Sequence, residues 1–457
     1  MRVFKNKVLK RIASLLLLLG FFILLDVGMG ELLSPPTYAT CFNHDVAAIE
    51  REGGADIVFV GASRVYRTFV PQVFEDVLGV RCVVNAGSST QPICGTYWEL
   101  KDLVERLHPK RVFIGVTWDQ LTKAPELQAR LIVIDRLSLK NRLQMSASCF
   151  GLSEMSYLLD TYRFKDNFVT NRIRANIMEK RKLAASNYAV FDKKSEYYAD
   201  TGFVHGGKSF AQGNIPVKST PTFSEEKIKP ENVAYLDACV RLCKDRGIDV
   251  ALVSGVTTVM RMYAIRRYQA AVDWFTAYAR DQQIPYYNLN YLVGREDFLP
   301  DDMMYDNNHT NGKGAREVSE RFAQILKRED AGEDVSSCFY PNLDAMKRDV
   351  RRIVSVRADI APAAGGGLHY ATSLFSLQND DVRPLYRLLG RQWEKSEFGL
   401  LQDWTPETNL DFTLPAPGAW TLRVEAGAAD PSMGIAFQEY PLAKISTRKA
   451  PAKVEEE

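Results

Sequence analysis

Five short apolar runs within the first 290 residues constrain the fold of this chain more than any other feature. They are "DIVFVG" (56–61), "VRCVVNA" (80–86), "RVFIGVT" (111–117), "IDVALVS" (248–254) and "IPYYNLN" (284–290). The runs are almost continuously apolar rather than alternating, which is typical of strands covered on both faces. Segments with helical periodicity precede the third, fourth and fifth runs. Strands that alternate with helices predict an α/β domain built on a parallel sheet.

The chain of 457 residues has room for two or three domains. We expect the α/β domain to cover residues 45–335, with an insertion at about residues 121–235 between the third and fourth runs. Part of the insertion has helical character ("EMSYLLDTYRF" and "NRIRANIMEKRKLAA"), and residues 199–230 are loop-like. A long excursion at the carboxyl edge of a sheet can form a substrate surface or lid, or only a helical cap. Both interpretations stay open.

The character of the sequence changes after residue 340. Short strand-like runs, such as "RRIVSVRADIAP" and "AWTLRVEAGA", are separated by Pro, Gly and Asp turns. This spacing predicts an antiparallel β-sandwich over residues 340–445. The stretch from "LYRLLGRQW" through "LQDWTP" to "PGAWTLRVEAGA" also resembles Ig-like domains of the triple-tyrosine-motif class. Residues 446–457 form a charged tail that we expect to be disordered.

The N-terminus combines a basic flank with an apolar run. Arginines or lysines at positions 2, 5, 7, 10 and 11 precede "IASLLLLLGFFILL" at residues 12–25. This pattern indicates a signal peptide or signal anchor within residues 1–35, with the bulk of the chain exported. Fourteen apolar residues suit a cleavable segment, yet "DVGMGELL" can extend the run and no A-x-A site follows closely. We therefore expect a single-pass membrane anchor, with cleavage and secretion as the alternative.

Composition narrows the possible partners. The net charge of +2 gives no reason to expect nucleic acid as a ligand. Neither a CxxC pair nor an HExxH motif is present among the seven cysteines and five histidines, so the sequence predicts neither a metal nor another cofactor. Cys239 and Cys243 lie on a probable helix, where two small core residues are the simpler interpretation.

Polar motifs follow three of the apolar runs. Ser63 lies in "GASR" after the first run, Asn85 and Gly87 lie in "NAGSST" after the second, and Asp306 and His309 lie in "YDNNHTNGKGA" after the last. The carboxyl ends of parallel strands meet at one edge of a sheet, so these groups can converge. Each motif alone also has a purely structural interpretation, as a helix cap or a Gly-Ser turn.

Taken together, "GASR", "NAGSS", "GVTWDQ" and "DNNHTNGKG" resemble the four sequence blocks of the SGNH (GDSL-like) hydrolase superfamily, over about residues 55–330. The resemblance implies a flavodoxin-like three-layer fold. It implies that Ser63 attacks an ester carbonyl, that His309 takes its proton and that Asp306 orients the imidazole. The implied oxyanion hole uses the backbone of Ser63 and of Gly87, with Thr90 as the alternative donor in the second block.

One block departs from the family pattern, because Thr117 and Trp118 stand where a G-x-N-D asparagine donor is expected. The Thr117 hydroxyl, or a group from the insertion, is a candidate replacement. Candidate substrate-binding residues are Arg64, Asn85, Thr90, Thr117 and Trp118. Arg64 can bind a carboxylate or phosphate through its forked donors, or form a structural ion pair.

The sequence therefore predicts an exported serine esterase or acyltransferase. Its expected substrate is an O-acyl group, foremost O-acetyl, on a cell-surface carbohydrate or a small ester. The alternative is a non-catalytic surface-binding or polysaccharide-assembly protein that keeps the fold but has lost the chemistry.

Overall fold

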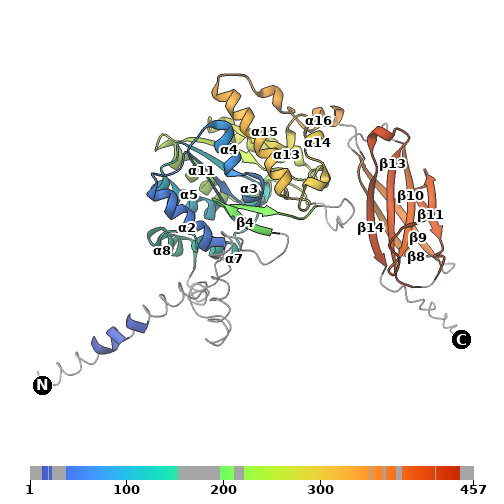
Figure 1. The fold of residues 1–457 in the computed structure, drawn as a ribbon, viewed down its shortest axis with the longest axis horizontal. Coiled ribbons are helices and arrows are strands. Elements are labelled where there is room, and N and C mark those ends of the chain that lie inside the picture. Colours follow the sequence, from blue (N-terminus) through green and yellow to red (C-terminus); the bar gives the residue numbers. More distant parts are fainter. Residues whose placement is uncertain are drawn as a thin grey trace, which may run out of the picture.

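The computed structural model of the chain describes residues 13–18, 20–22, 38–151, 154, 196–209, 221–349, 353–363, 367–376, 383–416 and 418–442. A five-stranded parallel sheet forms the centre of the first domain (Figure 1). Its strands are β1 (Ile57–Gly61), β2 (Val83–Gly87), β3 (Arg111–Gly115), β6 (Asp249–Ser254) and β7 (Tyr286–Asn288). They lie in the order β2-β1-β3-β6-β7, and every pairing is parallel. The prediction of an α/β domain with a flavodoxin-like strand order is confirmed.

Helices cover both faces of this sheet because alternate strand residues point to opposite sides. On one face, Val58 and Val60 of β1 join a core with helices from before and between the strands. These are α2 (Tyr38–Arg51), α5 (Ile93–Leu107), α11 (Pro230–Lys244) and α13 (Tyr268–Asp281). Cys239 and Cys243 are fully buried there, as expected of core residues.

On the other face, Ile57 and Phe59 join a second core with three helices. These are α3 (Ser63–Thr68), α4 (Pro71–Leu78) and α15 (Gly312–Asp330). Phe59 stacks on Phe69 and Phe113 at centroid distances of 4.4 and 4.8 Å, so α3 is held firmly against the sheet. Among the described residues of this domain, the remaining short helices are α6 (Trp118–Thr122), α7 (Leu127–Ile134), α8 (Leu139–Cys149), α12 (Val259–Ala264), α14 (Arg295–Phe298) and α16 (Leu343–Asp349).

The insertion differs from its sequence prediction. The stretch expected to be loop-like contributes β5 (Phe203–Gly206), which forms an antiparallel hairpin with β4 (Glu196–Asp200). The turn of this hairpin contacts β2, the outermost strand of the sheet. There the backbone amide of Asn85 donates to the Thr201 carbonyl at 2.8 Å. The hairpin therefore covers an otherwise open strand edge. The two predicted helices of the insertion lie outside the described residues, except for Glu154.

The segment with helical periodicity before the fifth apolar run, residues 260–283, forms two helices, α12 and α13, instead of one. Between them Arg266 pairs with Thr222, its amide donating to the Pro221 carbonyl at 2.9 Å. Arg267 then takes a left-handed conformation with φ +61°. This bridge, made to Thr222 in a segment far earlier in the chain, interrupts a continuous helical pattern.

The C-terminal region forms the predicted antiparallel β-sandwich. One sheet has the order β11-β10-β13-β14 and the other β12-β9-β8. The strands are β8 (Ile353–Pro362), β9 (Leu368–Ser376), β10 (Pro384–Gln392), β11 (Gly399–Thr405), β12 (Asn409–Phe412), β13 (Trp420–Ala428) and β14 (Ala436–Leu442). Val356 and Tyr370 of one sheet share a core with Leu388 and Val424 of the other. Strand β14 was not predicted.

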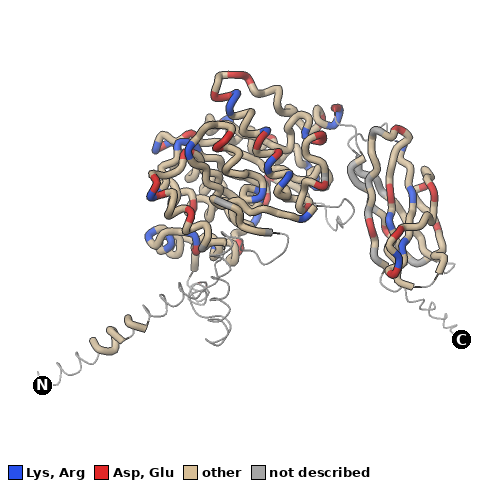
Figure 2. Tube along the Cα trace, in the orientation of Figure 1, with Lys and Arg blue, Asp and Glu red and all other residues tan. Residues whose placement is uncertain are grey.

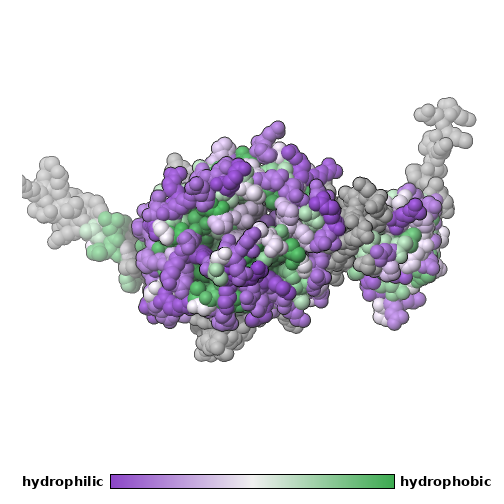
Figure 3. Space-filling view, turned by 90° about the horizontal axis from the view of Figure 1, so that it is seen from above, coloured by the Kyte–Doolittle hydropathy of each residue, from purple (hydrophilic) through white to green (hydrophobic). Residues whose placement is uncertain are grey.

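The N-terminal apolar run is described only at residues 13–18 and 20–22, which are helical. Its side chains are exposed, with Leu17 at 74% and Leu15 at 70%, and Figure 3 shows apolar side chains gathered there. Within the described ranges, no helix has both the length and the apolar character needed to cross a membrane. The rest of the predicted anchor and the charged tail lie outside the described residues. Elsewhere on the surface, basic and acidic residues are interspersed (Figure 2).

Candidate active site

Ser63 lies at the carboxyl edge of the sheet, at the point where β1 turns into α3. The turn depends on Gly61, which has φ +152° and whose missing Cβ would lie only 2.7 Å from the Gly115 carbonyl oxygen. Strand β1 therefore passes close to β3 before the chain reverses into the helix. Because Ser63 is the first residue of α3, its amide has no acceptor within the helix and can point toward a ligand.

His309 and Asp306 approach this serine from the loop before α15. Ser63 Oγ lies 2.8 Å from His309 Nε2, and His309 Nδ1 lies 2.9 Å from both carboxylate oxygens of Asp306. The loop is closed by a hydrogen bond from the Tyr305 amide to the His309 carbonyl at 2.8 Å. Asn311 caps α15, accepting from the Lys313 and Gly314 amides at 3.1 Å. The loop thus caps a helix and also presents His309 to Ser63.

The pKa of the Asp306 carboxyl lies below its ordinary value. Burial acts to raise the pKa of its carboxyl, but hydrogen bonding and charge from His309 outweigh that effect. The Asn308 and His309 amides, at 2.7 and 3.0 Å from Oδ1, lower the pKa further. An ionised carboxylate here favours the proton on Nδ1 of the imidazole. Nε2 is then free to accept the Ser63 hydroxyl proton.

Gly87 does not have the surroundings of an oxyanion donor. Its amide donates to Asn85 Oδ1 at 3.2 Å, and its carbonyl accepts from Tyr38 and Arg136. A Cβ at this position would lie 2.5 Å from the Tyr66 amide nitrogen, so the glycine permits α3 to pack directly on β2. The predicted role of Gly87 in the oxyanion hole conflicts with this geometry, because its donor is already used.

Thr90 fits the alternative assignment in the same loop. It is exposed and has a left-handed backbone with φ +50°, a conformation that costs free energy in a β-branched residue. Within the described part of the chain, its amide has no hydrogen-bond acceptor. Strain of this kind is often retained where a backbone group must face a ligand.

Asn85 is fully buried and contributes to the scaffold rather than to a substrate surface. Its Nδ2 donates to the carbonyls of Val65 and Phe69 at 2.9 and 2.6 Å. These bonds tie α3 to β2. The prediction that Asn85 contacts substrate is therefore wrong.

Thr117 is also occupied by a structural role. It forms a capping box at the start of α6, in which its amide donates to Gln120 Oε1 at 2.9 Å. Gln120 in turn donates to the Gln91 carbonyl at 2.9 Å and so links the loops after β2 and β3. The T-x-x-Q spacing of "TWDQ" is a sequence signal for such a cap, and the sequence interpretation missed it. Trp118 is half-buried and packs edge-on against Phe223 at 6.4 Å.

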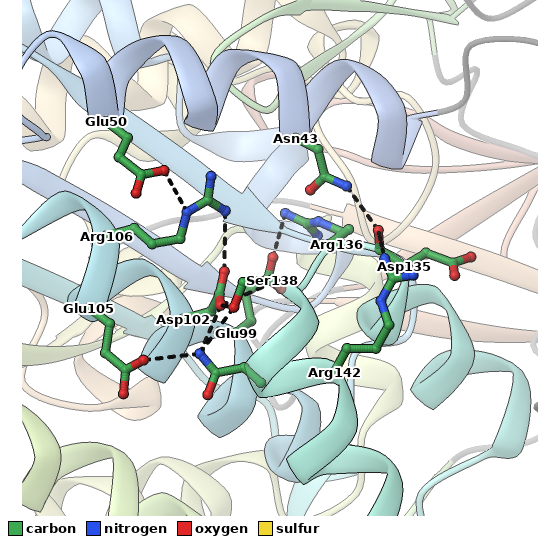
Figure 4. Close-up of polar contacts among 11 residues, drawn as sticks. Asn43, Glu50, Glu99, Asp102, Glu105, Arg106, Asp135, Arg136, Ser138 and Arg142 are labelled. Carbon is green, nitrogen blue, oxygen red and sulfur yellow. Dashed lines mark hydrogen bonds and ion pairs between the residues drawn. The ribbon is translucent and has the colours of Figure 1, made fainter. Parts of the chain in front are cut away.

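A buried ion pair that sequence reasoning also missed supports the loop after β2. Arg136 and Glu99 lie 2.7 Å apart, with side chains 0% and 1% exposed (Figure 4). Arg136 Nη1 also donates to the Gly87 carbonyl at 2.9 Å. Burial raises the pKa of Glu99 to about 7, and the nearby Asp102 adds to this, whereas the Arg136 charge opposes it. Arg136 also lies over the Phe42 ring at 3.9 Å. Through the hydrogen bond from Arg136 to Gly87, the ion pair stabilises the carboxyl end of β2.

Asp102, one turn further along α5, fastens the α7–α8 segment to the domain (Figure 4). It accepts from the Ser138 amide at 3.2 Å and from Asn141 Nδ2 at 2.8 Å, at the start of α8. Arg106 Nη1 donates to the other carboxylate oxygen of Asp102, Oδ2, at 3.3 Å. The acidic residues of α5 thus fix the start of α8, which belongs to the insertion, to the α/β domain.

Comparisons with known proteins identify no relative by sequence, since neither a family model nor a curated protein matches the chain. Solved structures with a similar fold include a GDSL-like lipase from Bacteroides thetaiotaomicron. It is 14% identical, with 64% of this chain and all of that chain covered at a TM-score of 0.30. Another is a lipolytic G-D-S-L family protein from Desulfitobacterium hafniense, 12% identical, with 59% and 97% covered and the same TM-score. These likenesses are too distant to assign an activity to this chain.

Proposed function

We propose that the protein is an exported serine esterase or acyltransferase that acts on O-acyl groups, foremost O-acetyl, of an extracellular or cell-surface carbohydrate. One observation carries the proposal: Ser63 Oγ, the His309 imidazole and the Asp306 carboxylate form a continuous hydrogen-bonded chain of 2.8 and 2.9 Å. This is the geometry that nucleophilic catalysis by a hydroxyl requires.

The first half-reaction forms an acyl-enzyme. Ser63 Oγ attacks the ester carbonyl while His309 Nε2 takes the hydroxyl proton, and Asp306 stabilises the resulting imidazolium. The amides of Ser63 and Thr90 bind the oxyanion of the tetrahedral intermediate. When the intermediate collapses, the C–O bond to the alcohol breaks and His309 returns the proton to the leaving oxygen.

The second half-reaction transfers the acyl group to an acceptor hydroxyl. His309 deprotonates either water, which gives an esterase, or a second carbohydrate hydroxyl, which gives an acyltransferase. The acceptor oxygen bonds to the acyl carbon, the bond from that carbon to Ser63 Oγ breaks, and His309 returns the proton to Oγ. A membrane-proximal carbohydrate substrate is supported by the basic and apolar N-terminal pattern and by the C-terminal β-sandwich. Both features are common in exported proteins that act at cell surfaces.

The alternative of a non-catalytic binding or assembly protein has one supporting observation. Thr117 is committed to its capping box and supplies no third oxyanion donor. A missing donor typically costs about 10²- to 10³-fold in kcat, which slows a triad without abolishing its chemistry. The intact chain from Ser63 to Asp306 therefore favours an enzyme.

Hydrolysis of 4-nitrophenyl acetate by the full-length protein, together with labelling by a fluorophosphonate, tests this proposal. We expect turnover and labelling for the wild type and neither for Ser63→Ala. Ser148→Ala serves as the control, because that hydroxyl is exposed on α8 and donates to the Gln144 carbonyl. Equal background turnover by wild type and Ser63→Ala, with no labelling of either, would favour the binding protein.

A further inference from the structure

The loop after β2 makes a tight turn at residues 88–91, and Thr90 occupies a strained position in it. Thr90 is the third residue of this turn and has φ +50°. Glycine or asparagine normally takes a positive φ in a turn, because the Cβ of other residues crowds the following carbonyl oxygen. A β-branched side chain makes this conformation rarer still. Other interactions must therefore hold Thr90 in it.

Gln91, the next residue, makes interactions of this kind. It is 0% exposed, and its side-chain Oε1 accepts from Ser88 Oγ at 2.7 Å, which closes the turn across Thr90. Its Nε2 donates to Thr96 Oγ1 at 3.3 Å, in the first turn of α5. Ser88 and Thr96 are also buried, so these hydrogen bonds are shielded from competition by water.

The backbone of Gln91 is fixed as well. Its carbonyl accepts from Gln120 Nε2 at 2.9 Å, and Gln120 belongs to α6, which follows β3. At the other end of the turn, the Ser88 amide donates to the Gly61 carbonyl at 3.0 Å, two residues before Ser63. Gln91 thus lies within a hydrogen-bond network that joins the chain segments after β1, β2 and β3.

This network determines where the Thr90 amide points. Strands β1 and β2 are in register, with Gly61 opposite Gly87. Ser63 lies two residues beyond the end of β1 and Thr90 three residues beyond the end of β2, so both amides lie at one edge of the sheet. Among the residues that the structure describes, no hydrogen-bond acceptor faces the Thr90 amide. A change of φ at Thr90 to a negative value would rotate this amide away from its present direction.

We propose that Gln91 is a positioning residue for the reaction: it restrains Thr90 in the left-handed conformation and so keeps the Thr90 amide directed at the oxyanion. This inference rests on the proposed function, in which that amide is one of the two oxyanion donors. A donor that is oriented in advance needs no reorganisation when the tetrahedral intermediate forms. Gln91 acts through its neighbours, because its buried side chain bonds to Ser88 and Thr96.

Gln91→Met in the full-length protein tests the restraint, since it removes both side-chain hydrogen bonds and nearly conserves volume. Without them, Thr90 should relax to a negative φ and its amide should be lost as a donor. We expect kcat for 4-nitrophenyl acetate and the fluorophosphonate labelling rate to fall by about 10²-fold, the usual cost of one oxyanion donor. KM should stay nearly unchanged, because the oxyanion is present only in the transition state.

The residue at position 90 separates a backbone restraint from ordinary packing. Glycine adopts a positive φ without a steric cost, whereas alanine keeps that cost. Compared with the corresponding single variant at position 90, Gln91→Met should cost about 10²-fold in kcat in Thr90→Ala protein but less than about 10-fold in Thr90→Gly protein. An equal loss in the two backgrounds overturns the proposal, because packing of the Gln91 side chain does not depend on backbone freedom at position 90.

Urea titrations test the same restraint without chemistry. While Gln91 is present, the unfolding equilibrium constant of Thr90→Gly should be about 3- to 10-fold lower than that of Thr90→Ala, because glycine relieves the left-handed strain. In Gln91→Met protein this advantage of glycine should disappear. If it persists unchanged, Gln91 does not impose the conformation of Thr90.

Asn141→Leu is the matched control, because it removes another buried amide side chain, 1% exposed, which donates to Asp102 Oδ1 at 2.8 Å in the α8 segment. It should lower the free energy of unfolding but leave kcat and labelling unchanged. If Asn141→Leu slows turnover as much as Gln91→Met does, the loss reflects general destabilisation and the positioning role is overturned.

The same measurements distinguish this proposal from the proposed function. Ser63-dependent turnover, with an equal cost of Gln91→Met in both position-90 backgrounds, overturns the role of Gln91 but keeps the esterase. Coupling between positions 90 and 91 in urea, without any Ser63-dependent turnover or labelling, overturns the esterase but keeps the restraint on Thr90.

Discussion

Gly87→Ala should inactivate the protein although the glycine contacts no reacting atom. The added methyl carbon would lie 2.5 Å from the Tyr66 amide nitrogen, 2.9 Å from Val65 Cβ and 3.1 Å from the Ala62 carbonyl oxygen. Ordinary contacts begin at 3.4 Å, so α3 must move by about 0.9 Å relative to β2. Tyr66 N is a backbone atom of α3 and Ala62 O a backbone atom of its N-cap residue, and backbone cannot rotate away as a side chain can.

That displacement is transmitted directly to the nucleophile, because Ser63 is the first residue of α3. A misplacement of about 1 Å typically costs on the order of 10²-fold in rate, and overpacking costs about 1–3 kcal/mol of stability. The Ser63–His309 distance of 2.8 Å has little room to lengthen before the hydrogen bond is lost. We therefore expect kcat/KM and the fluorophosphonate labelling rate to fall by about 10²-fold while the protein stays folded.

The assay compares Gly87→Ala with Gly399→Ala, in which the new methyl group lies 3.8 Å from its nearest neighbour in the β-sandwich. Thermal melts recorded with both variants show whether any loss of rate is a loss of fold. If Gly87→Ala retains wild-type kcat/KM and labelling, close packing of α3 on β2 does not position Ser63, and the reasoning is wrong.

Three further changes have defined outcomes. Asp306→Asn should lower kcat by about 10⁴-fold, because the amide no longer holds the imidazole in the required tautomer. The folded pKa of Asp306 lies below its ordinary 3.8, so its stabilisation is complete above pH 3.8 and is lost as the pH falls through the folded value. Thermal melts across acid pH should show this loss in the wild type but not in Asp306→Asn. Glu99→Leu should reduce the free energy of unfolding by about 3–5 kcal/mol in urea titrations, since it leaves Arg136 buried without a carboxyl partner. A Glu99→Leu, Arg136→Met double variant should be nearly as stable as wild type, and equal destabilisation of both would contradict the ion-pair argument. Thr117→Val should cost about 1 kcal/mol through the lost cap and leave kcat unchanged, whereas a 10²-fold loss in kcat would restore Thr117 as an oxyanion donor.

The strands and the motif positions could be predicted because both depend on local sequence. A continuous apolar run flanked by helices has few alternative structures to a buried strand. Ser63 lies two residues after the first such run. The order of the motifs then places Ser63 and His309 at one sheet edge. The break between α12 and α13 could not be predicted, because it depends on pairing between Thr222 and Arg266, far apart in the chain. Local periodicity contains no information about such a partner.

The sequence by itself determined the α/β architecture, the β-sandwich and the residues that can act as nucleophile, base and orienting acid. The architecture follows from periodicity, which is a property of short segments, whereas the three site residues follow from the resemblance of four short motifs to the SGNH superfamily. Only the tertiary structure decided which polar groups near the triad remain available to a ligand. Asn85, Gly87 and Thr117 are committed to the scaffold, whereas the Thr90 amide has no hydrogen-bond acceptor among the described residues. Availability depends on hydrogen bonds made between distant segments, and these exist only once the chain has folded.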